Sequence, residues 1–572
     1  MMKKSAFSTI RVCRRFLNLR SCRSRYYSSS TSPKSIANDS SRTFKVIGFG
    51  LAGFTGYMLG DKLHKPEREH TDEGSTLPLD KLQPAIYCTD PKKLDIVVQQ
   101  LKDVFNNDPA HFSDTKSDLD SHSDTYFSTH HPTPDQRPHI VLFPSTTEEV
   151  SKVMKICHDN KVPVVPFSGG TSLEGHFLPT RGRSTVVIDV SKYMNHILKL
   201  DTKDLDVQVQ AGVPWEDLND YLNDKGLLFG CDPGPGAQIG GCVANSCSGT
   251  NAYRYGTMKE NVINLTLVLP DGTIIKTKKR PRKSSAGYNL NGLFIGNEGT
   301  LGVVTEATVK CHVKPKLETV IVAAFPSVGE AAECSSNITQ EGIQLNAMEL
   351  LDDEMMKLIN NSGATFRTDW NETPTMFFKV GGKNENIVHQ TIKELEKIAK
   401  RHKASSFEFA TDDDEKLELW EARKVALWSV IDAGKSKNKN ANIWTTDVAV
   451  PLSNFAQIIE ETKEDMNKSP LINAIVGHAG DGNFHAFIVY SNDEEQKICE
   501  DIVERMVRRA IDLDGTCTGE HGVGIGKRKF LLEELGNEPV DLMRKIKLAI
   551  DPNRILNPDK IFKIDPEDQI EH

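Results

Sequence analysis

The sequence has no paired-cysteine motif and no excess of positive charge. Its 11 cysteines include no C-x-x-C and follow no regular spacing, which excludes a disulfide-framed small fold and favours reduced core cysteines. The 572 residues carry 70 Lys plus Arg against 79 Asp plus Glu, a formal net charge of −9. This balance argues against a dedicated nucleic-acid-binding protein and is compatible with a basic protein partner.

Acidic residues are absent from residues 1–27, which carry eight Lys or Arg residues among Ser, Leu and Phe. This composition is typical of a mitochondrial presequence, and a disordered basic arm that binds nucleic acid is the alternative. The basic block ends abruptly in an otherwise acidic chain, which favours the presequence. The serine-rich residues 28–43 are expected to be a linker. Roughly 500 residues remain, enough for two or three domains.

The N-terminal part of the chain lacks an apolar run long enough to be a clear membrane-spanning helix. Residues 46–59 are uncharged, but a helix needs roughly 20 apolar residues to cross a bilayer. They contain G-x-G-x-x-G, the spacing of a dinucleotide-binding turn, yet polar residues broken by a proline follow in place of a second strand. A G-x-x-x-G spacing and flanking lysines suit a membrane anchor better, so residues 44–62 are a possible inner-membrane anchor. A buried glycine-rich segment is the alternative.

Regular structure is expected from residue 138 onward, after an N-terminal extension and loop over residues 63–137. Residues 106–138 are rich in His, Ser and Asp and are interpreted as a long loop with solvated histidines. A strand, a helix and a second strand are expected over residues 139–144, 146–160 and 162–166. The following FSGGTSLEGH offers exposed backbone N–H groups and short hydroxyl donors, which a pyrophosphate needs.

Two more glycine-rich segments follow. DPGPGAQIGGCVANSCSGTNAYRYG, over residues 232–256, is built of small residues that let backbone approach a flat ligand closely. IGNEGTLGVV, over residues 295–304, is expected to enter a strand. Between the two glycine-rich segments, the turn Pro270-Asp-Gly272 predicts a β-hairpin.

These three motifs, in this order, resemble the FAD-binding domain of the vanillyl-alcohol-oxidase and p-cresol-methylhydroxylase flavoprotein family. The resemblance implies an α+β fold, with a two-subdomain FAD-binding domain over residues 138–315 and a C-terminal α+β substrate (cap) domain over residues 316–572. It implies that FAD is held, without a covalent bond, by Pro166, Ser168, Gly169, Gly170, Thr171, Ser172, Gly175, Pro233, Gly240, Gly241, Asn245, Ser248, Gly249, Tyr255, Gly256 and Val304.

The second half of the chain carries a candidate metal set. Residues 472–478 and 484–490 read as a hairpin that brings His478 and His485 together, and a later glycine loop holds Glu520 beside His521. Two imidazoles and a carboxylate suit Zn²⁺, Mn²⁺ or Fe²⁺. The alternative is core histidines hydrogen-bonded to backbone. On the helix expected over residues 415–433, Arg423 shares a face with Trp420, although a surface arginine is the simpler interpretation.

GHAGDGNFH and TGEHGVG resemble the C-terminal domain of FAD-linked 2-hydroxyacid dehydrogenases, the D-lactate, D-2-hydroxyglutarate and glycolate group. The resemblance implies that His478, His485 and Glu520 bind a divalent metal. It also implies that Arg423 and Asn483 hold the substrate, that His521 is the catalytic base and that cytochrome c accepts the electrons.

The size of the substrate is predicted from two threonines. Enzymes that oxidise 2-hydroxyglutarate resemble this chain but place a lysine just before the Asp ahead of the final strand, whereas Thr445 and Thr446 precede Asp447 here. Because an unpaired buried carboxylate is costly, D-lactate or a similarly small acid is expected. Dehydrogenation of D-2-hydroxyglutarate or glycolate, a non-redox synthase on the same flavin domain, and an inactive flavin-binding module remain alternatives.

Overall fold

The computed structural model describes residues 74–568. The predicted presequence, linker and possible anchor therefore lie outside the described residues, as does the G-x-G-x-x-G stretch. Across the described part of the chain, no helix is both long enough and apolar enough to cross a membrane.

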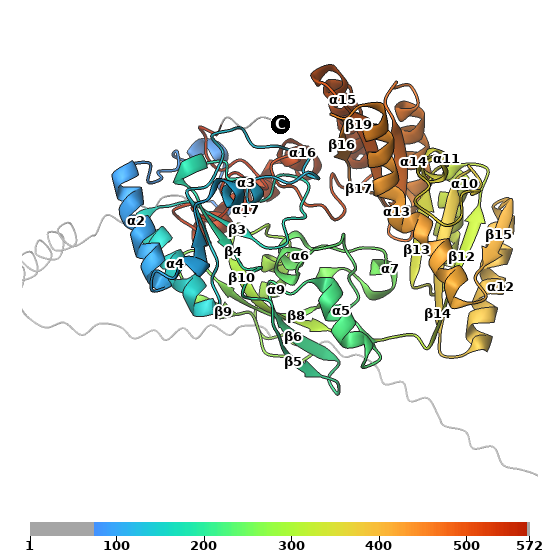
Figure 1. Ribbon diagram of the computed structural model, residues 1–572, viewed down its shortest axis with the longest axis horizontal. Helices are drawn as coiled ribbons and strands as arrows, with labels where there is room; N and C mark the ends of the chain where they lie inside the picture. Colours follow the sequence, from blue (N-terminus) through green and yellow to red (C-terminus); the bar gives the residue numbers. More distant parts are fainter. Residues whose placement is uncertain (1–73, 569–572) are drawn as a thin grey trace, which may run out of the picture. The chain divides into compact units, whose positions relative to one another are not determined.

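The first subdomain is built on a four-stranded sheet with the order β1-β2-β4-β3 (Figure 1). Strands β2, β4 and β3 run parallel, and β1 is antiparallel to β2. The apolar side of α4 packs on this sheet and against α2. The elements are α2 (Pro91–Val104), β1 (Phe112–Ser113), α3 (Lys116–Ser121), β2 (Ile140–Leu142), α4 (Thr147–Asn160), β3 (Val164–Phe167) and β4 (Val186–Asp189).

The second subdomain is an antiparallel five-stranded sheet with the order β5-β6-β10-β8-β9. Its interior strand β8 reads VINLTLV and is almost wholly buried, whereas edge strand β5 is half exposed. The elements are β5 (Ile197–Asp201), β6 (Asp206–Gln210), α5 (Trp215–Asn223), β7 (Leu227–Leu228), α6 (Ile239–Asn245), α7 (Ala252–Tyr255), α8 (Met258–Asn261), β8 (Val262–Val268), β9 (Ile274–Lys276), α9 (Leu290–Phe294), β10 (Val303–Lys310) and β11 (His312–Val313).

The C-terminal part is an antiparallel eight-stranded sheet with the order β15-β12-β14-β13-β18-β19-β16, in which β17 also pairs with β19. Its elements are β12 (Leu317–Ala324), α10 (Val328–Gln340), β13 (Ala347–Leu351), α11 (Asp353–Ser362), β14 (Thr375–Gly382), α12 (Glu385–Arg401), β15 (Ser406–Phe409), α13 (Asp413–Lys437), β16 (Asn442–Thr445), β17 (Val448–Ala449), α14 (Leu452–Met466), β18 (Asn473–His478), β19 (Asn483–Tyr490) and α15 (Asp493–Asp512).

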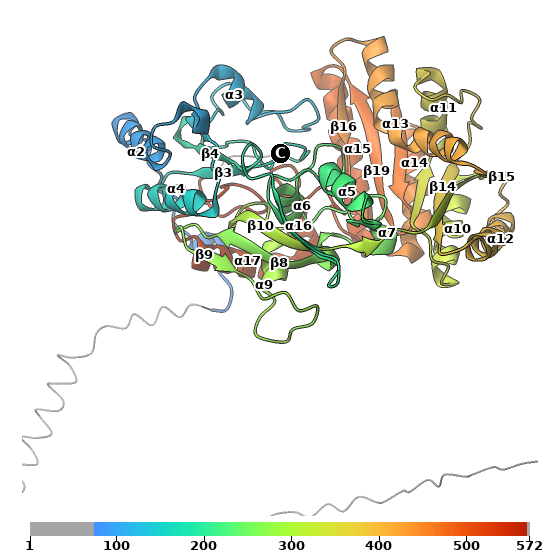
Figure 2. The ribbon, with the colours of Figure 1, turned by 60° about the horizontal axis from the view of Figure 1, so that its bottom comes forward.

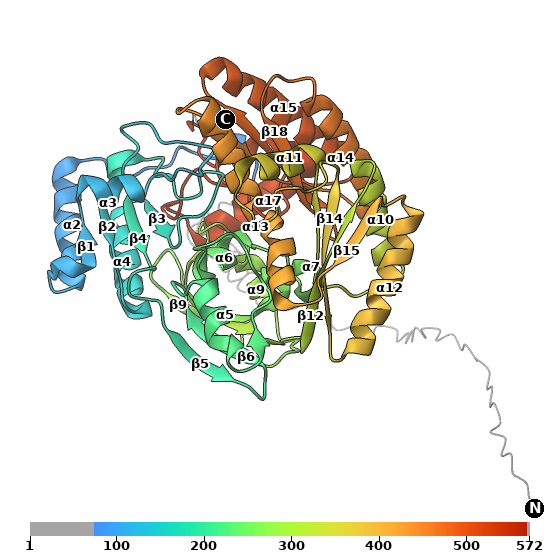
Figure 3. The ribbon, with the colours of Figure 1, turned by 45° about the vertical axis from the view of Figure 1, so that its right-hand side comes forward.

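Each face of this sheet has its own hydrophobic core because successive strand residues point to opposite sides. Helices α10, α12, α14 and α15 cover one face, and Figure 3 shows α10 and α12 beside β14 and β15. Helices α11 and α13 cover the other face. In β18 and β19, Val476 and Phe487 point toward α11 and α13. The alternation therefore places His478 and His485 on that same face.

The last residues of the chain return to the first subdomain after α16 (Arg528–Leu535) and α17 (Asn537–Ile550). Leu556 pairs with Val164 of β3. The Asn557 side chain donates hydrogen bonds to the carbonyl oxygens of His176 (3.0 Å) and Glu298 (2.7 Å). The C-terminal segment therefore completes the FAD-binding half, an arrangement that sequence order alone did not indicate.

The expectation of solvated histidines in residues 106–138 was wrong for two of them. His122 is buried, with Nε2 3.1 Å from Asp189 Oδ2. His130 Nε2 lies 3.3 Å from Glu174 Oε2. Both carboxylates are buried, and a buried carboxylate needs a hydrogen-bonding partner. The expectation of a long loop was also wrong, because the segment contains β1 and α3 and supplies partners to the core. Regular structure begins before residue 138, with α2.

A buried ion pair on the eight-stranded sheet leads to a stability prediction. Lys463 Nζ lies 2.6 Å from Asp352 Oδ2 and 2.9 Å from Asp353 Oδ1, but only the Asp352 side chain is fully buried. Asp352→Ala should lower the free energy of unfolding by about 3 to 5 kcal/mol, because it removes the buried partner of the ammonium group. Asp353→Ala should cost less than about 1 kcal/mol. Urea denaturation measures both, and equal effects would contradict the assignment.

Candidate active site

A cavity of about 920 Å³ lies where both halves of the described chain meet. One wall of the cavity, which we call the FAD wall, is lined by residues that were predicted to hold FAD: Pro166, Ser168, Gly169, Gly170, Thr171, Ser172, Pro233, Gly240, Gly241, Asn245, Gly249 and Val304. His478, His485, Glu520, His521 and Arg423 line the same cavity.

The glycines of this wall are needed because two backbone segments approach closely. A Cβ on Gly169 would lie 2.5 Å from the carbonyl oxygen of Gly236, and one on Gly240 would lie 2.8 Å from Ala211 Cβ. Gly170 has a φ of +65°, which side chains rarely tolerate. The loop after β3 and the start of α6 can thus present backbone N–H groups to a pyrophosphate, which fits FAD.

Four predicted FAD residues do not line the cavity. Gly175 packs against Ile525, and Gly256 accepts a hydrogen bond from Asn261. Tyr255 lies against the ring of His312, with 4.7 Å between centroids. Ser248 instead donates to Glu520 Oε2 at 2.5 Å, which ties the glycine-rich segment to the candidate metal set.

The two histidines of the candidate metal set both lie close to one oxygen of the Glu520 carboxylate. His478 Nε2 and His485 Nε2 each lie 3.2 Å from Glu520 Oε1. The three ligand atoms lie within 4.8 Å of one another. Burial would raise the pKa of Glu520, but the two histidines hold it well below its usual value. The carboxylate is therefore ionised, as a metal ligand must be.

The other ring nitrogen of each histidine is already engaged. His478 Nδ1 lies 2.8 Å from Glu349 Oε1, and His485 Nδ1 lies 3.0 Å from the carbonyl oxygen of Thr446. Partners of this kind fix the orientation of metal-binding histidines and leave Nε2 for the ion. A two-histidine, one-carboxylate set with these supports fits a divalent transition metal.

Glu349 is a site residue that the sequence did not reveal. It is buried in β13 opposite His478 of β18, and it accepts a 2.8 Å hydrogen bond from Arg423 Nε. It therefore links the predicted metal ligand to the predicted substrate arginine. The available signal was a single acidic residue inside the otherwise apolar strand 347–351.

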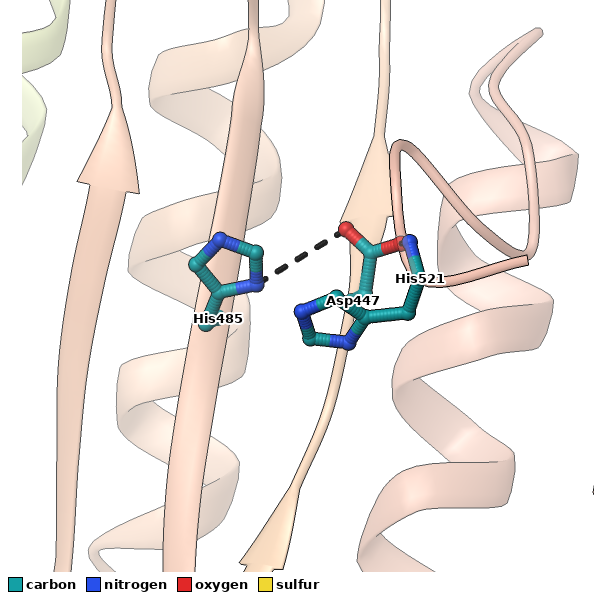
Figure 4. Close-up of side chains that lie close together, drawn as sticks. All are labelled: Asp447, His485 and His521. Carbon is teal, nitrogen blue, oxygen red and sulfur yellow. Dashed lines mark hydrogen bonds and ion pairs between the residues drawn. The ribbon is translucent and has the colours of Figure 1, made fainter. Parts of the chain in front are cut away.

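His521 lies beside His485 with the rings stacked, 4.8 Å between centroids and 11° between planes (Figure 4). Its loop is fixed by Asp447, whose Oδ2 accepts the backbone N–H groups of Glu520 (2.8 Å) and His521 (2.9 Å). Burial lowers the pKa of His521 to about 4, although the Asp447 carboxylate opposes this shift. The imidazole is neutral at pH 7 and can accept a proton.

Asn483 is placed differently from the other predicted residues. Its side-chain nitrogen donates to Asp447 Oδ1 (2.7 Å) and to the carbonyl oxygen of Val448 (2.8 Å), and it does not line the cavity. The structure thus places Asn483 behind the site, where it supports Asp447. Asp447 itself is a second residue whose part in the site was missed.

Comparison with known proteins identifies the two domains and the family of the chain. Residues 138–278 match the FAD binding domain model, and residues 314–561 match the model of FAD linked oxidases, C-terminal domain. Mitochondrial D-lactate dehydrogenase [cytochrome] 1 of Saccharomyces cerevisiae is 71% identical over 86% of this chain and 84% of its own length. The mitochondrial D-lactate dehydrogenase [cytochrome] of Arabidopsis thaliana is 45% identical over 74% and 73%.

Solved structures confirm the predicted fold class. p-Cresol methylhydroxylase superposes with a TM-score of 0.67 over 85% of this chain and 98% of its own length, at 16% identity. An alkyldihydroxyacetonephosphate synthase gives a TM-score of 0.63 over 85% and 89%, at 18% identity. The protein is an FAD-dependent oxidoreductase. The chain belongs to the FAD-linked oxidases, in the family of the mitochondrial cytochrome-type D-lactate dehydrogenases.

Proposed function

We propose that this protein oxidises D-lactate to pyruvate and passes the electrons to cytochrome c. The observation that carries the proposal is the meeting, in one cavity, of the FAD wall, the His478, His485 and Glu520 set, Arg423 and His521. The names of the curated relatives support the same substrate and acceptor.

The proposed substrate carboxylate binds to Arg423. Glu349 occupies Nε of this guanidinium, so its terminal nitrogens remain for a carboxylate, which they can bind through two parallel hydrogen bonds. Apolar side chains line the same cavity, among them Val476, Phe487 and Leu427. A methyl group such as that of lactate fits such a wall better than a second charge does.

The proposed chemistry divides between the chain and its bound groups. Bound FAD supplies the acceptor for the hydride that leaves C2 of the substrate. A divalent metal held by His478, His485 and Glu520 would supply a Lewis acid toward the substrate hydroxyl. His521 takes the hydroxyl proton at its imidazole, which is neutral and lies on the cavity wall. Asp447 positions the loop that carries this base.

Cytochrome c is proposed as the acceptor, and the mitochondrial inner membrane as the location. The relatives are named mitochondrial, and a chain with net charge −9 attracts a basic haem protein over long range. Anchoring through residues 44–62 is part of this proposal. Carbonate extraction of mitochondria tests it, because release of the protein into the supernatant would contradict an anchor.

Removal of the metal should abolish turnover while leaving FAD in place. The predicted ligands and the FAD wall are different residues, so a chelator should remove D-lactate-driven flavin reduction and leave the flavin spectrum nearly unchanged. Adding back Zn²⁺, Mn²⁺ or Fe²⁺ identifies the ion that restores the rate. A full rate in protein shown to be metal-free by elemental analysis would remove the metal from the proposal.

D-2-hydroxyglutarate is a second candidate substrate because of one observation. Lys379 also lines the cavity, with its ammonium 4.0 Å from the ring centroid of Trp420. A distal carboxylate could reach this cation in place of the lysine that is absent at Thr446. Lys379→Met separates the two substrates, since it should weaken use of D-2-hydroxyglutarate far more than use of D-lactate.

A further inference from the structure

The loop between β9 and α9 has a charge opposite to that of the whole chain. Residues 276–283 contain six Lys or Arg residues, and residues 276–290 contain no Asp or Glu, in a chain with net charge −9. Figure 2 shows this loop projecting below α9, away from the neighbouring strands. None of its residues lines the FAD cavity, so the proposed catalytic function does not account for it.

One of these cations holds the loop to the protein, and the others point to an external partner. Arg280 forms ion pairs with Asp201, Asp204 and Asp206 around the β5–β6 turn. The remaining five have no ion pair with any residue from 74 to 568, and most of them are exposed; they are Lys276, Lys278, Lys279, Arg282 and Lys283. The loop is therefore fixed at Arg280, and its other cations are available to bind an external anion.

An exposed aromatic ring and apolar side chains accompany these cations. Tyr288 is 96% exposed at the end of the loop, and Ile274 and Val313 are 42% and 65% exposed. The positive charge also extends beyond the loop. Burial lowers the pKa of His312 to about 4, and the nearby Lys310 and Arg282 lower it further.

We propose that the loop of residues 276–289 docks this protein on an anionic lipid bilayer. Each Lys or Arg near such a surface strengthens binding about fivefold, and tyrosine is enriched at the boundary between headgroups and acyl chains. Cytochrome c does not fit this surface, because two basic surfaces repel each other. A nucleic acid fits less well, because the chain as a whole is acidic.

The test places a fluorescent reporter in the loop, so that an anchor elsewhere in the chain does not mask the result. Tyr288→Trp is made in the full-length holoenzyme and mixed with vesicles of brominated phosphatidylcholine, with or without phosphatidylglycerol. The difference spectrum against the parent protein reports residue 288 alone. Quenching with a blue shift is expected only with the anionic vesicles, and high salt should reverse it.

Two charge-reversed pairs complete the test in the Tyr288→Trp background. Arg282→Glu with Lys283→Glu should weaken the quenching at least about tenfold in lipid concentration. Lys393→Glu with Lys397→Glu, on the exposed face of α12, makes the same change in net charge and should have no effect. D-lactate-driven flavin reduction should be the same in all three proteins, so this result is independent of the proposed reaction.

Three outcomes would overturn the proposal. Equal quenching by neutral and anionic vesicles would show that charge does not drive the contact. Equal weakening by the α12 pair would assign the effect to net charge alone. Displacement of the loop from vesicles by a low concentration of single-stranded RNA would assign the surface to nucleic acid instead.

Discussion

His521→Ala should slow the reduction of bound flavin by D-lactate about 100-fold or more. The imidazole is the neutral group on the cavity wall that is stacked on the predicted ligand His485, and burial keeps its pKa near 4. Without it, the hydroxyl proton must leave to water while the hydride is transferred. Anaerobic stopped-flow absorbance of the flavin measures this step directly.

His196→Ala is a suitable control, because His196 is exposed and bonds only to Gln210 among the described residues. It should leave the rate unchanged. The His521→Ala protein should also keep its FAD and its metal, since neither proposed binding set includes His521. A near-normal rate in that protein would remove His521 from the mechanism.

Arg423→Met should raise the KM for D-lactate about 10- to 100-fold, the effect of losing a charge-assisted hydrogen bond of about 1.5 to 3 kcal/mol. Among the described residues, the same change leaves Glu349 with His478 as its only hydrogen-bond partner. Because Glu349 orients this predicted metal ligand, metal affinity should fall as well. Steady-state kinetics with an artificial acceptor and titration of the metal measure the two effects separately.

Arg423→Lys distinguishes charge from shape. Lysine keeps the positive charge but cannot form the paired hydrogen bonds of a guanidinium, so partial recovery of KM is expected. Arg508→Met removes an exposed arginine paired with Glu504 and Glu533 and should change neither KM nor metal affinity. An unchanged KM in Arg423→Met would contradict the assignment of the carboxylate site.

Residues that neighbouring strands or a single loop bring together could be predicted from the sequence. His478 and His485 lie on consecutive strands, and Glu520 lies in a glycine loop whose residue types pointed to a ligand. Glu349 could not be found in the same way, because its position depends on β13 lying next to β18, a pairing between segments more than 120 residues apart. Asp447 was missed because its role is to hold backbone N–H groups, and these carry no signature in the sequence.

The FAD wall also combines local features that the sequence predicts with contacts between distant segments that it does not. The motif of residues 167–176 predicted the pyrophosphate loop because glycines and hydroxyls are local features. The contribution of the C-terminal segment through Asn557 could not be predicted, since the chain returns to β3 only after the whole C-terminal part. Gly175 and Gly256 belong to the motifs but pack against protein, so a motif alone does not separate residues near a ligand from residues that shape its loop.

The most direct test of the proposed function is the steady-state rate of cytochrome c reduction with D-lactate, L-lactate and D-2-hydroxyglutarate as substrates. The site predicts the highest kcat/KM for D-lactate, because Arg423 offers a carboxylate site and Val476, Phe487 and Leu427 add apolar side chains to the same cavity. It predicts little activity with L-lactate, whose methyl group and C2 hydrogen are exchanged in position. A preference for D-2-hydroxyglutarate, or flavin that none of the three substrates reduces, would contradict the proposal.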